Sequence, residues 1–230
     1  MQQENFDLDS KQVGVLPIVN HFLHRLQFEQ LLENYLPPGD RRVKIKPVQT
    51  LGVLLRNIII GRSPLYSIQE WAQQMVPELI GLESKQLRLL NDGRAGRALD
   101  RLFEADRNSM LTDLVVYMVK EFAIELEQFH NDSTTPTLHG EYLDADGYIE
   151  RGKPTLVACL GHSKDHGPDL KQLLWILTVS EDGAIPVHFK VADGNTEDST
   201  TQLPRPTEEY VGNHTSLSNF SAMSALLFMR

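Results

Sequence analysis

The feature of this sequence that most constrains its fold is a pair of apolar runs in the second half of the chain. Residues 173–179 and 185–191 flank the turn sequence EDG at 181–183. Two runs of strand length around a glycine-containing turn predict a β-hairpin. Residues 129–139 precede this hairpin; they are rich in threonine and predict a strand. The second half is therefore expected to contain a strand, an irregular excursion and a hairpin.

The first 126 residues have a different pattern, because their apolar residues recur at helical spacing. Residues 13–36 predict one helix, which the sequence PPGD at 37–40 ends. The next helix is expected to have Pro47 in its first turn and Gly61 at its C-cap. The change of period near residue 126 indicates two regions of different structural class.

Two further helices are predicted before the strand region. Asn91 or Asp92 is expected to cap a helix over residues 94–105, and Ser109 is expected to cap the long helix that follows. The predicted fold class is α+β. An N-terminal helical domain at 10–126 precedes an incomplete sheet at 127–201, and residues 202–230 are expected to form a poorly ordered tail.

Composition excludes several protein classes. No apolar run reaches the roughly 18 to 20 residues that a membrane span needs, so no membrane partner is expected. The N-terminal sequence MQQENFDLDSK is polar and unlike a signal peptide, and Cys159 is the single cysteine. A cytoplasmic location is expected on these grounds.

The formal net charge of −9 conceals two local clusters of basic residues. Residues 41–62 carry no acid, and residues 94–101 carry three arginines. Such clusters suit contacts with DNA phosphates, but they equally suit solvated helix faces. The residues expected at a DNA interface are Arg41, Arg42, Lys44, Lys46, Arg94, Arg97 and Arg101.

The candidate for metal chemistry is Asp132, which lies within the predicted strand and precedes the hydroxyl residues Ser133, Thr134 and Thr135. A strand carboxylate beside hydroxyls can bind a hard divalent cation, although an acid there can also be an ordinary edge or turn residue. A second hypothesis is a metal-dependent hydrolase that uses Asp132 with His130 and His139. The sequence GHSKDH at 161–166 departs from both the nucleophile-elbow and the zinc-helix patterns.

Two stretches of the second half resemble insertion-sequence transposases of the DDE type. They are FHNDSTTPTLHGEY at 129–142 and the text from GHSKDHGPDL at 161 to DST at 200. The sequence NDGRAGRALDRLFEAD at 91–106 is similar to the domain that precedes the catalytic domain in one branch of these enzymes. The resemblance covers roughly residues 10–201.

This resemblance implies a ribonuclease-H-like fold of the retroviral integrase superfamily and an activity in DNA transposition. Enzymes of this kind hold two Mg²⁺ ions with an Asp, Asp, Glu triad, and Asp132 matches the first Asp, which sits on the central strand. The implied partners are double-stranded DNA at the ends of the element and further transposase chains, as a homo-oligomer or as full-length enzyme.

The resemblance stops near residue 201, before positions that would match the second Asp and the Glu. Asp193 and Asp198 are better interpreted as turn and cap residues, and only Glu208 and Glu209 follow them as acids. We therefore expect a C-terminally shortened transposase that is catalytically incomplete. The alternative is a non-catalytic DNA-binding or inhibitory fragment. A partial sheet should also leave one edge and one face exposed.

Overall fold

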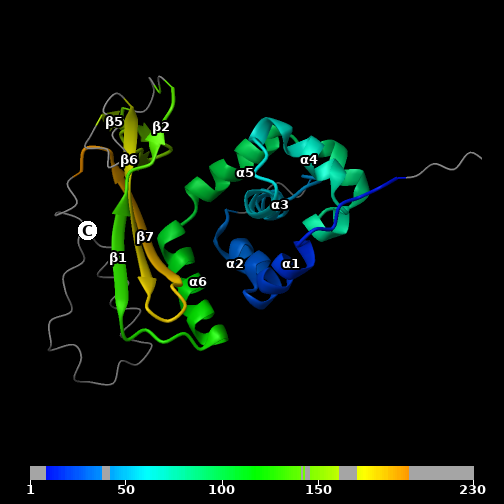
Figure 1. The fold of residues 1–230 in the computed structure, drawn as a ribbon. Coiled ribbons are helices and arrows are strands. Elements are labelled where there is room, and N and C mark those ends of the chain that lie inside the picture. Colours follow the sequence, from blue (N-terminus) through cyan, green and yellow to red (C-terminus); the bar gives the residue numbers. More distant parts are fainter. Residues whose placement is uncertain (1–8, 38–41, 141, 143–145, 161–169, 197–230) are drawn as a thin grey trace, which may run out of the picture. The chain divides into compact units, whose positions relative to one another are not determined.

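The computed structural model describes residues 9–37, 42–140, 142, 146–160 and 170–196. The chain divides into two compact units, Met1–Leu114 and Val115–Arg230. The first unit is helical and the second contains an antiparallel sheet, so the predicted α+β class is confirmed at this level (Figure 1). The predicted domain boundary after residue 126 and the observed division at 114 both leave helices α1 to α5 in the first unit.

The first predicted helix is in fact two helices, α1 at Leu16–Arg25 and α2 at Phe28–Tyr35. Gln27 has a φ of 48°, in the left-handed region, which ends one helix and redirects the chain into the next. The prediction of a single helix was wrong because the break contains neither glycine nor proline. Both helices still bury a leucine in the same core, Leu16 and Leu32.

Helix α3 at Pro47–Ile60 is the central element of the first unit (Figure 1). Pro47 lies in its first turn and Gly61 follows as the C-cap, as the sequence predicted. Gly61 has a φ of −104°, however, so no left-handed turn requires a glycine there. The requirement is steric, because a Cβ at this position would clash with the indole ring of Trp71.

Short helices and two longer ones complete the helical region. The side chain of Asn91 accepts a hydrogen bond from the Arg94 backbone N–H, so its predicted capping role is confirmed. The predicted cap Ser109 is wrong: Asp106 accepts hydrogen bonds from both the backbone N–H and the hydroxyl of Ser109. The elements are η1 Leu65–Ser67, α4 Ile68–Gln74, η2 Pro77–Ile80, η3 Ser84–Leu89, α5 Asp92–Glu104 and α6 Arg107–Phe122.

The first unit has one continuous hydrophobic core to which every helix from α1 to α5 contributes. Its most deeply buried large side chains include Leu16, Ile45, Ile68, Ile80 and Leu90. Burying this much apolar surface is the main stabilising contribution in a domain of this size.

The main sheet of the second unit is built on β6 at Lys171–Ser180, with β1 at Phe129–Thr134 and β7 at Pro186–Asp193 as antiparallel neighbours. The predicted hairpin is thus confirmed as β6 and β7. Smaller strands accompany it. They are β2 Thr137–Leu138 and β5 Cys159–Leu160, which pair with the start of β6, and the ribbon of β3 Ile149–Glu150 with β4 Lys153–Pro154.

The two faces of β6 differ in burial. Leu174, Ile176 and Thr178 are buried on one face, whereas Trp175 and Leu177 are exposed on the other. No described strand pairs with the outer edge of β1. Within the described residues, the predicted exposed edge and face are therefore confirmed. The resemblance also implied that the strand bearing Asp132 is central, and this is not confirmed. In the described sheet β1 lies at an edge, and β6 is central.

Candidate metal and nucleic-acid sites

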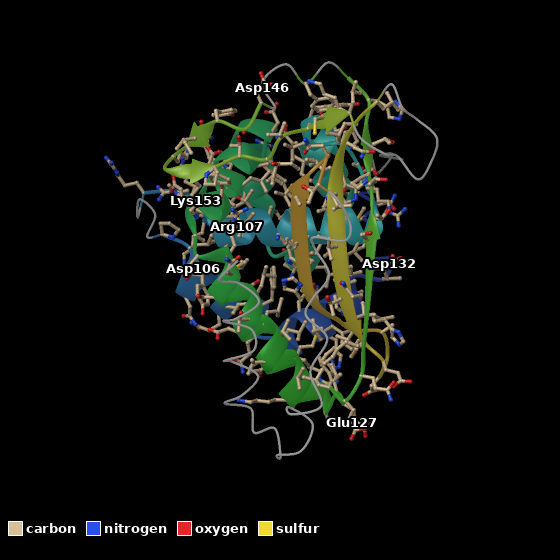
Figure 2. The ribbon with its side chains drawn as sticks, turned by 90° about the vertical axis from the view of Figure 1, so that its left-hand side faces the viewer. Asp106, Arg107, Glu127, Asp132, Asp146 and Lys153 are labelled. Carbon is tan, nitrogen blue, oxygen red and sulfur yellow. The ribbon has the colours of Figure 1, made fainter. Side chains whose placement is uncertain are left out.

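Asp132 lies within β1 and pairs across the sheet with Leu177 of β6 (Figure 2). Its side chain is exposed, and its Oδ1 accepts a hydrogen bond of 2.8 Å from the backbone N–H of Ser133. One carboxylate oxygen is therefore bound to the adjacent backbone. The neighbouring Asn131 points to the other face, where its Oδ1 accepts a hydrogen bond of 3.1 Å from the hydroxyl of Thr178.

The described residues do not assemble a metal site around Asp132. Among them, no group of three or more His, Cys, Asp and Glu side chains is close enough to hold an ion. His130 and His139 are both exposed, and the structure does not gather them with Asp132 into such a group. A pair of Mg²⁺ ions needs several carboxylate ligands, so the described residues alone do not fit the implied cofactor.

The other acids considered from the sequence divide into described and undescribed positions. Asp193 accepts a hydrogen bond of 2.8 Å from the backbone N–H of Val157, which agrees with its interpretation as a structural residue. The remaining acidic candidates, Asp198, Glu208 and Glu209, lie outside the described residues, as do His162 and His166 of the sequence GHSKDH.

The first basic cluster precedes α3 and is largely exposed. Lys44 and Lys46 are exposed, and the Lys46 Nζ lies 3.5 Å from Glu33 Oε1. A surface ion pair of this kind contributes little stability, so Lys46 can exchange Glu33 for a phosphate at small cost. Arg42 is also exposed, and Arg41 lies outside the described residues.

The second cluster is a stripe of arginines on α5. Because α5 is a regular helix, Arg94, Arg97 and Arg101 occupy positions that fall on one side of it. Arg94 is partly committed, since its Nε donates a 2.9 Å hydrogen bond to the carbonyl of Leu89. Arg97 is exposed and Arg101 is half-buried, so these two guanidinium groups are better placed to meet a phosphate.

Arg56 belongs to the same basic stretch of sequence as the first cluster but has a different role. It is buried in α3, where its Nε donates to Asn20 Oδ1 at 2.8 Å and its Nη1 to the Gly52 carbonyl at 3.0 Å. Burial lowers the pKa of the guanidinium, although the charge of Glu29 opposes that shift. Counting charges along the sequence missed this, whereas the position of Arg56 between the buried residues of α3 could have indicated it.

None of the helices in the described part of the chain combines the length and the apolar character that crossing a bilayer would require.

Among known families, residues 8–116 match a domain of unknown function, DUF4277. This range ends two residues beyond the first compact unit, so the match coincides closely with the helical region. No curated protein matches the chain, and no solved structure matches it.

Proposed function

We propose that this chain is a DDE-type transposase-family protein for DNA transposition, and that its second unit carries the first carboxylate of an incomplete catalytic centre. The observation that supports the proposal is the position of Asp132 within β1, the first strand of the antiparallel order β1, β6, β7. The resemblance in sequence leads to the same arrangement, in which a strand bearing an Asp precedes a hairpin.

The register of the sheet supports a functional role for Asp132 over a purely structural one. The carboxylate lies on the face of the sheet that also presents Leu177 of β6 and Phe189 of β7, where no described residue makes an ion pair with it. An unpaired carboxylate beside apolar side chains adds nothing evident to the stability of the sheet. A metal-bound phosphate is the type of ligand that such a carboxylate helps to hold.

The same geometry limits what these residues can do alone. A single carboxylate with one oxygen already hydrogen-bonded cannot position two metal ions. We therefore assign no cleavage step to the described residues. The proposed activity of the chain by itself is binding of double-stranded DNA, with Arg97 and Arg101 of α5 and Lys44 and Lys46 contacting phosphates. Such binding would inhibit a complete transposase by occupying the ends of its element.

DNA binding is tested by titrating duplexes that carry the element's ends, at a series of salt concentrations. We expect the logarithm of the affinity to fall linearly with the logarithm of salt concentration. Arg97→Gln with Arg101→Gln should reduce the slope by about two, because each phosphate contact contributes about one. Exposed Arg88, on η3, provides the matched control Arg88→Gln. Absence of binding at low salt would reject the proposal.

Catalytic incompleteness is tested by incubating the same duplexes with Mg²⁺ or Mn²⁺. We expect no cleavage by the chain alone. Cleavage that is lost in Asp132→Asn and retained in Glu127→Gln would show that further ligands complete the centre; Glu127 is an exposed acid just before β1 (Figure 2). That result would uphold the transposase assignment and overturn the claim of incompleteness.

A further inference from the structure

The exposed face of the sheet presents a row of large apolar side chains. Leu177 of β6 pairs with Phe189 of β7 and with Asp132 of β1, so the three lie side by side on one face. Trp175 lies two residues from Leu177 on β6 and shares that face. The exposed fractions of Trp175, Leu177 and Phe189 are 48%, 44% and 43%.

Such a patch is unusual for a surface that only faces water. Isolated apolar residues on a surface are normal, but contiguous aromatic and aliphatic side chains mark a surface that contacts something else. Among the described residues, the opposite side of this sheet contributes Leu174, Ile176 and Ala192 to a buried cluster. The sheet thus has more apolar surface to bury than its described core accounts for.

We propose that residues 220–230 of this same chain dock on the face formed by Trp175, Leu177 and Phe189. The segment reads FSAMSALLFMR and combines six large apolar residues with small ones. Its apolar side chains can cover the exposed rings while its serines remain at the periphery. The large apolar residues are Phe220, Met223, Leu226, Leu227, Phe228 and Met229.

The length of the intervening chain permits this contact. The described residues end at Thr196, shortly after β7, and residues 197–219 separate that point from the segment. A chain of this length can span at most roughly 75 to 80 Å when fully extended. A strand of the length of β7 spans about 26 Å, so the segment can reach any part of the face.

Charge also favours this occupant. The charged side chain of the segment is Arg230, and the acid on the exposed face is Asp132. Opposite charges at the margin of an apolar contact help to set its register. Docking would bring apolar side chains next to Asp132 and restrict its access to solvent. This inference goes beyond the proposed function and holds whether or not the chain binds DNA.

The two tryptophans of the chain provide a direct test. Trp175 is on the proposed docking face, whereas Trp71 is 5% exposed within the first unit. Acrylamide should therefore quench mainly Trp175 if this residue is accessible. We expect weak quenching in the intact chain. The combined variant Leu226→Ser, Leu227→Ser and Phe228→Ser should raise the quenching constant about twofold or more, because uncovering an indole restores much of its accessible surface.

Leu217→Ser serves as the matched control, since it lies just outside the segment and should leave quenching unchanged. Trp71→Phe provides a second measurement in which all emission comes from Trp175. That replacement also removes an indole N–H that is buried without a partner, so the first unit should tolerate it. Equal quenching in the intact chain and the triple variant overturns the proposal. Protection that increases with protein concentration also overturns it, because it identifies a second copy as the occupant.

Discussion

The two units of this chain bury their apolar side chains to different extents. In the helical unit, α1 to α5 all contribute to one core that extends from Leu16 to Ala105. In the sheet unit, the buried cluster contains Leu174, Ile176 and Ala192, and the other face of the same strands is exposed. Helices can close around a central helix such as α3, whereas the sheet built on β6 has two faces to cover. Among the described residues, the helical unit therefore has one closed core, whereas the sheet leaves the face of Trp175 and Leu177 exposed.

The contrast matters for function because the two candidate sites lie on different units. The arginine stripe is on α5, whose buried face includes Ala95 and Ala98. Its geometry is held by a complete core, so phosphate binding should not depend on the sheet. Asp132 is on β1, at the edge of the sheet. The metal-binding role that we propose for Asp132 would need further ligands, and the described residues do not gather them around it.

The largest expected effect tests the core of the helical unit. Ile68 of α4 is fully buried, and Ile68→Ala should lower the free energy of unfolding by about 3 kcal/mol through lost burial and a cavity. Ile58 of α3 is 65% exposed, so Ile58→Ala should cost less than about 1 kcal/mol. Denaturant unfolding followed by Trp71 emission measures both. Equal effects at the two positions would contradict a closed core.

A smaller effect is expected for the same kind of change in the sheet unit. Leu174→Ala removes a buried side chain from β6, but it should cost only about 2 kcal/mol because the small buried cluster around it can relax. The matched control is Leu160→Ala on the short strand β5, where the side chain is exposed. The readout is unfolding followed by Trp175 emission. A cost at Leu174 as large as that at Ile68 would show that the sheet is as well buried as the helical core.

Local sequence signals predicted the elements whose determinants are also local. The hairpin of β6 and β7 follows from two apolar runs around a turn, and Pro47 and Asn91 mark helix starts by their own backbone chemistry. The break at Gln27 was missed, because a left-handed residue other than glycine is stabilised by its surroundings. Asp106, rather than Ser109, caps α6; the sequence did not separate them because both residue types are favourable helix caps.

The candidate site was less predictable than the fold. The strand position of Asp132 agrees with the sequence interpretation, but its proximity to other ligands depends on long-range packing. Arg56 shows the same limit, since a charge that looks available in a basic stretch is buried against Asn20. Periodicity indicates which face a residue occupies. It does not indicate which distant residue meets it there.

The smallest expected effect concerns a polar contact that adds to the helical unit. The Tyr35 hydroxyl donates a hydrogen bond to Asp113, and burial, followed by this bond and the charges of Asp113 and Asp106, raises its pKa from 10.0 to about 12. A pKa that is higher in the folded state contributes stability below pH 10 that is lost as pH rises towards 12. The free energy of unfolding, measured between pH 10 and 12, should therefore fall more steeply with pH in the intact chain than in Tyr35→Phe. Asp113→Asn should bring the pKa of Tyr35, followed by ultraviolet absorbance, closer to its ordinary value of 10.0. Identical pH profiles of stability for the intact chain and Tyr35→Phe would exclude this contribution.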